Sequence, residues 1–525
     1  MESGGGARSR PGLASCFRLL SFPSDMGFGL FLLWSFQFGG GEGPLPGELP
    51  LSMAALGWRA RVGARWAGVA GRSRRWSGVV DVVKESRRGI ALCGVAWAMA
   101  VLYSAVVPLG EAPDEGAHLY FLERLAGESE LPRFSPVEAP LSYEAHQPPL
   151  DYAIVAGAAS AIGVLPTGYP LAANPGLDFE TPGSRATLEI GAPPGAVRSF
   201  HLVRWLRALW LLPTALVILA TARRVGGNRR GAAMAGVASV VLCPQLLFTS
   251  GTVNNDGAVT FFAGACLLLL LQLESSESPA VGRAALAGGT AAFAVLSKGT
   301  GLALLAPLAL VAYRHGWRGR RPAVAAALLL PALAGGLALL GLNEWRFGSP
   351  GFAFPAEPGH EAGAALQRLV EEPGWIATLG SSFWARFGWF NLPLPIPAYL
   401  LFVPASALAV GGLSAALGRS RSGAPQEEAG ARDRRAARLA VSLLAANLAL
   451  VIGHMVLIAW QPQGRLLFPS LGALCVLVTL GARRVLSLGE SRRWRGARHA
   501  LPAVLVAVGL AANALSLWWI LRAYE

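Results

Sequence analysis

The sequence predicts an all-α integral membrane protein with about 11 transmembrane helices and a long first external loop. Hydrophobic residues make up 53% of the 525 residues and charged residues only 14%, and the mean hydropathy is +0.45. This composition is typical of chains that cross a membrane several times. Two further observations agree with it: apolar segments recur at bilayer length, and arginines concentrate in the short segments between them.

Residues 1–88 form an extension rich in glycine and arginine, ahead of a membrane domain expected over 89–525. We expect the extension to be disordered, or its first part to lie upstream of a true start at Met53. Its apolar run Gly27–Phe36 is too short for a span, although it resembles part of a signal segment. In the membrane domain, apolar runs predict spans at about 89–109, 202–222, 232–249, 257–273, 283–297, 299–314, 322–342, 398–417, 437–460, 466–483 and 500–520.

The positive-inside rule orients these spans, because arginine-rich segments fall on one side of the expected bilayer. These segments are Arg223–Arg230, Tyr313–Arg321, Gly418–Arg438 and Ser491–Arg498. The other side receives two long external loops, at about 110–200 and 343–397. The apolar stretch 150–164 must lie along that outer surface, because a crossing there would place Arg223–Arg230 outside. This topology explains the net charge of +14, so nucleic acid is not an expected partner.

Polar residues gather at the outer ends of the predicted spans, where charged groups at membrane depth usually mark function. In the stretch after the first span, Asp114, Glu115 and His118 share one helical face. A carboxylate there can remove a proton from an acceptor hydroxyl, so Asp114 and Glu115 are the predicted catalytic residues. Two alternatives stay open: Asp114 as a helix N-cap, and His118 as an orienting hydrogen-bond partner.

Further along the outer side, His146 and Gln147 end the acidic loop, and Asn255 and Asp256 begin a span. We expect all four to line a substrate site, although Asn255 and Asp256 also suit a helix cap. No cofactor is required by the sequence. A divalent metal bound by histidine and carboxylate groups is an alternative, although the sequence shows only an incomplete set of ligands for it.

Three cations on the outer side run against the arginine bias of the opposite side. Lys298 lies between two short apolar segments, Arg386 lies in an aromatic external segment, and Arg465 begins a span. Such cations suit a phosphate group, so they are predicted substrate-binding residues. For Lys298 the alternative is a side chain that only snorkels to the membrane surface.

Six motifs in this order resemble a family of bacterial membrane proteins known as domain of unknown function 2142. The resemblance covers about 89–520, and its motifs here are Ala112–His118, Glu144–Tyr152, Thr252–Asp256, Ser297–Gly301, Phe383–Trp389 and Gln463–Pro469. That family is similar in layout to the GT-C glycosyltransferases, which use polyprenyl-phosphate sugar donors at the outer membrane face. The resemblance implies that Asp114 takes the role of their acidic residue after the first span. Ala112 departs from the proline that the family often has there.

These observations together predict a glycosyltransferase of the bacterial cytoplasmic membrane. Its expected partners are a polyprenyl-phosphate-linked sugar donor, a cell-envelope glycan, lipid or protein acceptor at the external face, and membrane lipids. The alternatives are a transporter or flippase of lipid-linked glycans, and a non-catalytic membrane scaffold. A transporter would spread its polar groups through the membrane midplane, and a scaffold has no reason to gather them on one face.

Overall fold

The computed structural model describes residues 87–525, except 129, 134–141, 165–170, 179–180, 190–193, 277–278, 349–359, 418–423 and 489–494. The chain divides into two units, Met1–Arg88 and Gly89–Glu525. The extension predicted for 1–88 lies outside the described residues, apart from its last two. The fold described below is that of the second unit.

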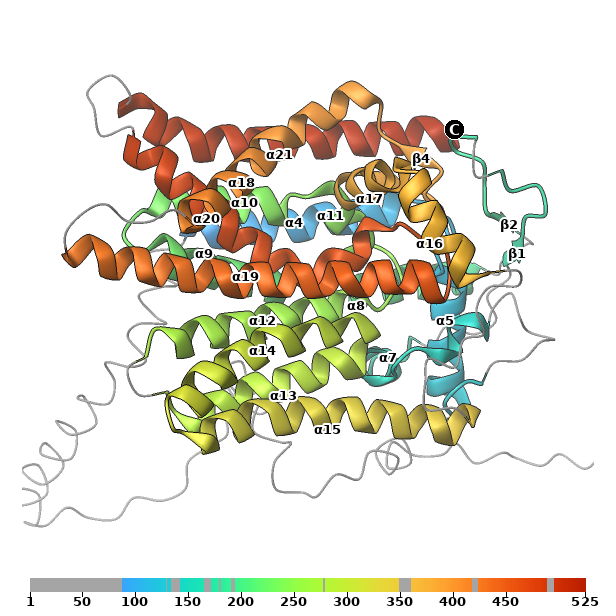
Figure 1. Cartoon of the computed structure of the whole chain (residues 1–525). Coiled ribbons are helices and arrows are strands. Elements are labelled where there is room, and N and C mark those ends of the chain that lie inside the picture. The colour runs from blue at the N-terminus through green and yellow to red at the C-terminus, as the bar shows by residue number, and fades with distance from the viewer. Residues whose placement is uncertain are drawn as a thin grey trace, which may run out of the picture. The chain divides into compact units, whose positions relative to one another are not determined.

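Long apolar helices lie side by side in this unit and run between the same two ends of it (Figure 1). Among the described residues, eight helical stretches are long and apolar enough to cross a membrane. They consist of α4 (Arg87–Val106), α8 and α9 (Pro194–Ala208, Leu211–Gly226), α12 (Asp256–Glu274), α15 (Pro322–Phe347), η7 and α18 (Ile396–Phe402, Val403–Leu417), α19 (Ala424–Leu457), η8 and α20 (Gly464–Ser470, Leu471–Leu488) and α21 (Arg495–Tyr524).

A ninth span results if α10 (Arg230–Val241) and α11 (Pro244–Ser250), which meet at a bend of 56°, are counted together. The bend falls at Pro244, which begins α11 and cannot continue the backbone ladder of α10. The two remaining predicted spans correspond to shorter pieces. These are α13 (Val281–Ser297), and η5, α14 and η6 (Gly299–Leu304, Leu305–Val311, Ala312–Arg318). The count of about 11 spans therefore stays a prediction.

The segments between these helices at one end fold into short elements. They are α5 (Glu115–Glu123), η2 (Arg124–Glu128), η4 (Tyr143–His146), α7 (Leu150–Ala161), the antiparallel pair β1 (Leu171–Ala173) and β2 (Thr187–Glu189), α16 (Ala362–Glu371), α17 (Gly374–Trp384), and the antiparallel pair β3 (Arg386–Phe387) and β4 (Leu392–Pro393). The helix α7 takes the place of the predicted surface segment 150–164, and it has only 12 residues. It lies beside α5 at the right of Figure 1.

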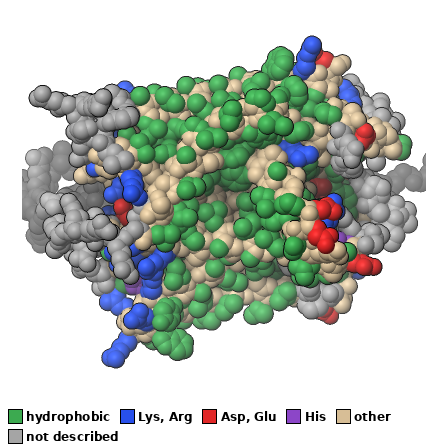
Figure 2. All heavy atoms as spheres, turned by 45° about the horizontal axis from the view of Figure 1, so that its top comes forward, with side chains coloured by type: hydrophobic (Ala, Val, Ile, Leu, Met, Phe, Trp, Pro, Cys, Tyr) green, Lys and Arg blue, Asp and Glu red, His purple; other side chains and the backbone are tan. Residues whose placement is uncertain are grey.

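Charge separates the two ends of the helical unit. Figure 2 shows hydrophobic side chains across the middle of one face, with most Lys and Arg toward the left and Asp and Glu toward the right. We call the end that carries α5 and η4 the acidic end, and the end that carries Arg224, Arg318 and Arg483 the basic end. Exposed leucines on α15 agree with a hydrophobic region between the two ends. A helix surface that faces lipid has no need of polar groups.

Close packing between α18 and α20 holds the middle of α20. A Cβ atom on Gly412 of α18 would lie 1.9 Å from the carbonyl oxygen of Leu477 on α20. A Cβ atom on Gly481 of α20 would lie equally close, at 1.9 Å, to the carbonyl oxygen of Leu408. Only glycine allows the two backbones to meet in this way, as is common between membrane helices. This packing fixes α20, and with it the segment η8 that precedes it.

Candidate functional site

Asp114 lies in the turn between α4 and α5, with its side chain directed to two partners from elsewhere in the chain. One carboxylate oxygen accepts a hydrogen bond from the Tyr143 hydroxyl at 2.8 Å, and the other forms an ion pair with Arg465. Asp114 occupies the N-cap position of α5, but its side chain makes no capping hydrogen bond. Its φ of 65° is in the left-handed region, which aspartate tolerates better than most residues. Backbone strain of this kind often accompanies functional sites.

Arg465 enters the site from η8, at the start of the α20 span. Its side chain is buried, with 7% of its surface exposed. The guanidinium lies 5.4 Å from the ring centre of Phe390, and its Nε donates to the Gln463 side chain at 2.9 Å. Cation–ring and hydrogen-bond contacts hold the guanidinium at one position. The structure thus places a predicted anion-binding cation directly against the predicted base.

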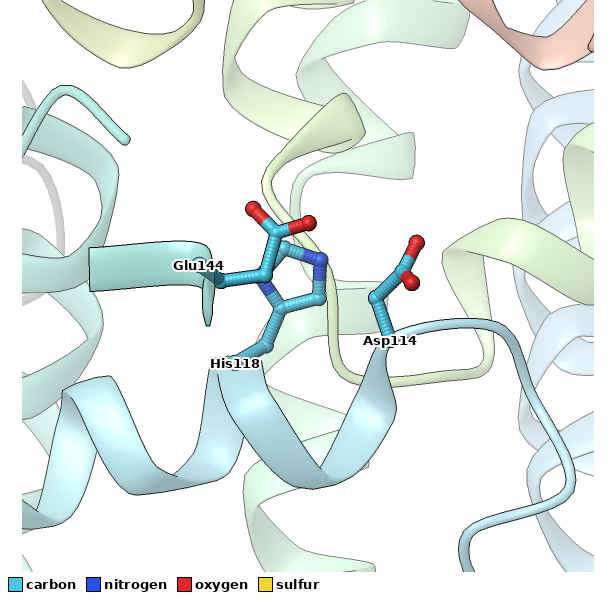
Figure 3. A group of neighbouring side chains, drawn as sticks. All are labelled: Asp114, His118 and Glu144. Carbon is cyan, nitrogen blue, oxygen red and sulfur yellow. The ribbon is translucent and has the colours of Figure 1, made fainter. Parts of the chain in front are cut away.

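His118 and Glu144 complete a cluster with Asp114. One ligand atom from each of the three side chains lies within 4.8 Å of the others. Figure 3 shows all three side chains directed into the same space, with Asp114 and His118 from neighbouring turns and Glu144 from η4. The His118 ring is buried, and its Nδ1 lies 2.5 Å from the hydroxyl of Tyr152. The orienting role left open for His118 therefore has a partner in Tyr152.

Glu144 has the electrostatics of a proton acceptor that works near neutrality. Burial, followed by the negative charge of Asp114, raises its pKa to about 7, although Lys298 and Arg465 oppose the shift. Among the residues the structure describes, none forms a hydrogen bond to its Oε2 atom. A carboxylate with a pKa close to the working pH is well suited to general base catalysis.

His118 and His146, the two histidines of the site, both have lowered pKa values, which favour the neutral imidazole. Burial and the nearby cations, Lys298 foremost, lower the pKa of His118 well below its usual value. Burial also lowers the pKa of His146 to about 4. His146 Nδ1 donates to the carbonyl oxygen of Tyr143 at 2.8 Å, and the Gln147 amide lies 3.3 Å from His146 Nε2. Both histidines therefore act here as neutral hydrogen-bonding groups.

Lys298 forms a second ion pair of the site, with Asp256. Its Nζ lies 2.5 Å from Asp256 Oδ1, and 10% of the lysine side chain is exposed. The side chain is buried and paired, whereas a snorkelling lysine extends its charge toward water. Lys298 is also close enough to His118 and Glu144 to shift the pKa of both. Asn255 Nδ2 links this pair to the outer loop by donating to the Gln147 side chain at 2.9 Å.

Glu115, which the sequence also predicts to be catalytic, has a different set of contacts from Asp114. Its carboxylate is fully buried in a two-pronged ion pair with Arg204, with distances of 2.8 and 2.6 Å. The backbone N–H groups of Gly110 and Val253 donate to the same carboxylate, at 3.1 and 2.9 Å. With four donors the carboxylate is saturated, so it is suited to holding α4, α5 and the Val253 loop together rather than to catalysis.

Arg386 is the second predicted residue that lies outside the cluster. It belongs to β3, where its side chain donates to the carbonyl oxygen of Phe390 and its backbone N–H donates to Gln245 at 2.7 Å. The Arg386 guanidinium is thus engaged within the loop between β3 and β4. Arg386 shapes the loop that carries Phe390, and Phe390 in turn contacts Arg465.

Residues that the sequence reasoning did not select also build the site. Glu144 belongs to the cluster, and Tyr143 donates to its Asp114. Arg346 of α15 donates to the backbone carbonyl groups of Pro132, Ala145 and Gln147. Glu144 lies in the same short stretch as His146, which was the available signal. No sequence signal identifies Arg346, since its partners are backbone atoms 199 or more residues away.

The cluster of Asp114, His118 and Glu144 has the donor types for a divalent metal, but its surroundings disfavour one. Both Asp114 oxygens already accept from protein donors, and His118 Nδ1 is engaged with Tyr152. The positive charges of Lys298 and Arg465 act on His118 and Glu144. These cations take the place that a metal would have in stabilising negative charge, so the residues fit a metal poorly.

Comparisons with known proteins agree with the helical membrane architecture. The family of dolichyl-phosphate-mannose-protein mannosyltransferases matches residues 179–334. ArnT from Cupriavidus metallidurans in its apo state is similar in structure, with a TM-score of 0.50 and 13% identity over 83% of this chain and 76% of ArnT. No curated protein matches the sequence.

Two further solved structures show weaker similarity. ArnT bound to undecaprenyl phosphate has a TM-score of 0.44 and 14% identity over 83% of this chain and 75% of ArnT. The oligosaccharyltransferase AglB from Archaeoglobus fulgidus, in complex with an inhibitory peptide and a dolichol-phosphate, has a TM-score of 0.45 and 13% identity over 84% of this chain and 56% of AglB. The similarity to apo ArnT shows that this chain is an all-α, multi-pass membrane protein with a fold of the GT-C type.

Proposed function

We propose that the protein is a membrane glycosyltransferase that moves a sugar from a polyprenyl-phosphate donor to a cell-envelope acceptor. The observation that carries this proposal is the contact between Asp114 and Arg465 beside His118 and Glu144. In this contact, the carboxylate of Asp114, which can accept a proton, lies next to Arg465, which can bind a phosphate. The match of residues 179–334 to the dolichyl-phosphate-mannose-protein mannosyltransferases supports the same chemistry.

Two ion pairs define the resting state of the proposed site. Asp114 neutralises Arg465, and Asp256 neutralises Lys298. A donor phosphate competes with both carboxylates for the two cations, because phosphate offers more charge and more acceptor oxygens than a carboxylate. Donor binding therefore releases Asp114 from Arg465. The carboxylate then becomes available for the acceptor only when the donor is present.

The transfer step requires one bond to form and one to break. The acceptor oxygen attacks the anomeric carbon of the sugar, and the bond from that carbon to the phosphate oxygen breaks. The acceptor proton moves to a carboxylate, and the leaving polyprenyl phosphate keeps the electron pair. Arg465 and Lys298 stabilise the charge that develops on this leaving group. We assign the proton to Asp114, with Glu144 as the neighbouring acid that can share it.

The external face of the bacterial cytoplasmic membrane is the proposed location of the site. The site is built at the acidic end, where α12 begins, α13 ends and α20 is preceded by η8. Arginines such as Arg224, Arg318 and Arg483 lie at the opposite end, which the positive-inside rule assigns to the cytoplasm. A transporter would place its charged groups near the midplane, whereas these charged groups lie at helix ends.

The test of the proposed function compares cell-envelope glycans by mass spectrometry. A deletion strain is complemented with wild-type protein or with Asp114→Asn, and the amount of each protein in the membrane is matched. We expect a sugar modification that the wild type restores and Asp114→Asn does not. An unchanged glycan profile in the deletion strain would count against the transferase proposal, as would full restoration by Asp114→Asn.

A further inference from the structure

A second charged feature lies at the basic end, away from the proposed site. An open cavity of about 260 Å³ is lined by residues from α9, the α9–α10 loop, α19 and α20, namely Arg224, Val225, Gly226, Gly227, Asn228, Arg229, Arg432, Asp433 and Arg483. Four arginines thus face one aspartate. The volume equals that of several water molecules, which leaves room for a small anionic group.

Contacts within the cavity leave one buried arginine donor without an acceptor. Asp433 accepts from Arg483 at 2.7 Å, and that pair is half-buried. Arg432 donates to the carbonyl oxygen of Arg224 at 2.9 Å, and Arg224 donates to the Ser275 hydroxyl. Among the described residues, no acceptor meets the buried Nε atom of Arg224. A buried donor without a partner is unfavourable, and an oxygen of a bound anion would satisfy it.

The cavity lies at the depth of lipid headgroups if the helices span the membrane. Arg224 is in the last turn of α9, Arg432 is near the start of the span Gly430–Leu457, and Arg483 is near the end of the span Gly464–Ser487. The positive-inside rule concerns an excess of Lys and Arg in cytoplasmic loops and requires no convergence of their side chains. Here they come from separate helices and converge on one opening, which is the arrangement of basic pockets that bind anionic headgroups.

We propose that this cavity, named here the basic cavity, binds a phosphate group, supplied by the headgroup of an anionic lipid or by a soluble phosphate. The guanidinium groups of Arg224, Arg229 and Arg432 would provide planar, charged donors to its oxygens. A phosphate there would also join α9, α19 and α20, the last of which is continuous with η8 and Arg465. The proposal does not depend on the transferase activity.

The experiment uses the purified full chain with Arg229→Gln and Arg432→Gln combined. The matched control combines Arg318→Gln with Arg321→Gln, two exposed arginines of the same end outside the cavity. Native mass spectrometry measures the affinity for phosphatidylglycerol and for phosphatidylcholine of the same chain length. A second arm measures inorganic phosphate, alone and as a competitor of phosphatidylglycerol.

We expect the cavity variant to bind phosphatidylglycerol about tenfold more weakly than the wild type, because two charge-assisted hydrogen bonds are lost. The control should bind like the wild type, and phosphatidylcholine should bind weakly to all three. Inorganic phosphate that binds and competes identifies a soluble phosphate as the ligand, and failure to compete identifies the lipid headgroup. Equal affinity of cavity variant and control for both probes would overturn the proposal. If the double variant does not fold, the exposed Arg432→Gln alone should weaken binding about threefold.

Discussion

Asp114 and Arg465 form an ion pair although 351 positions separate them in the chain. The carboxylate comes from the turn after the first membrane helix, and the guanidinium comes from the segment before α20. The Tyr143 hydroxyl holds the other oxygen of Asp114 at 2.8 Å. The proposed base and the proposed phosphate ligand therefore occupy one place, and each partner of the pair can be tested separately.

Replacement of Asp114 by Asn should reduce sugar transfer by at least about 100-fold, since general base catalysis contributes 10²–10⁴-fold. Asn keeps the size of the side chain and tolerates the left-handed backbone at this position. Purified variant and wild type should therefore show similar thermal unfolding, while release of polyprenyl phosphate falls. Turnover at the wild-type rate in the folded variant would exclude Asp114 as the base.

Replacement of Arg465 by Gln should weaken binding of undecaprenyl phosphate by about 10- to 100-fold, because a charged hydrogen-bond donor to the phosphate is lost. Lys298→Gln should act in the same direction. Arg124→Gln is the matched control, because Arg124 lies at the same end in an exposed pair with Glu128, and it should change affinity less than about threefold. Native mass spectrometry of the three variants measures this. A larger loss in the control than in Arg465→Gln would contradict the assignment.

Glu144 should give the site a pH dependence centred near neutrality. The carboxyl has a pKa of about 7 in the folded protein, raised chiefly by burial. If it accepts a proton during transfer, kcat/KM rises with pH through about 7, and Glu144→Gln removes that rise. A pH profile of transfer for the two proteins tests this. An identical rising limb in Glu144→Gln would assign the limb to another group.

The same pKa shift makes a prediction about stability, with a definite sign. The folded protein holds the Glu144 proton up to about pH 7, whereas an unfolded chain releases it near the ordinary value of about 4.5. Stability from this group is therefore complete below about 4.5 and is lost as the pH rises to about 7. Thermal unfolding followed from pH 4 to 8 should show a smaller decline in Glu144→Gln than in the wild type. A decline of the same size in both would show that Glu144 does not carry the shift.

Glu115 should matter for stability rather than for chemistry. Glu115→Ala leaves Arg204 buried without its ion-pair partner, which typically costs about 3–5 kcal/mol. The control is Glu128→Ala, which removes the exposed Arg124–Glu128 pair and should cost less than about 1 kcal/mol. Denaturant unfolding measures both. Normal stability of Glu115→Ala together with lost transfer would restore Glu115 as a catalytic residue.

The cations at the site imply that transfer does not require a divalent metal. We expect chelation by EDTA to leave turnover of purified protein unchanged, because Lys298 and Arg465 already supply positive charge for the phosphate. Activity that disappears with EDTA and returns with Mg²⁺ or Mn²⁺ would show that Asp114, His118 and Glu144 hold a metal after all.

Much of this architecture follows from the sequence by itself. Apolar segments of bilayer length predict membrane helices, and loop charge predicts which ends they share, because lipid and membrane potential act on each segment independently of its neighbours. The same reasoning selected Asp114, Lys298 and Arg465 as polar groups at one end. It also predicted that the apolar stretch 150–164 does not cross the membrane. The structure has the 12-residue helix α7 there.

Tertiary structure alone decided how those charged groups are used. Asp114 and Glu115 are adjacent in sequence and identical in charge type, yet one meets Arg465 and the other is enclosed by Arg204. Nothing local distinguishes them, since the difference depends on which distant helix packs against each side chain. The elevated pKa of Glu144 likewise arises from burial and from the nearby negative charge of Asp114. Sequence determined which chemistry was available at this end of the membrane domain, and long-range packing determined which residue is free to perform it.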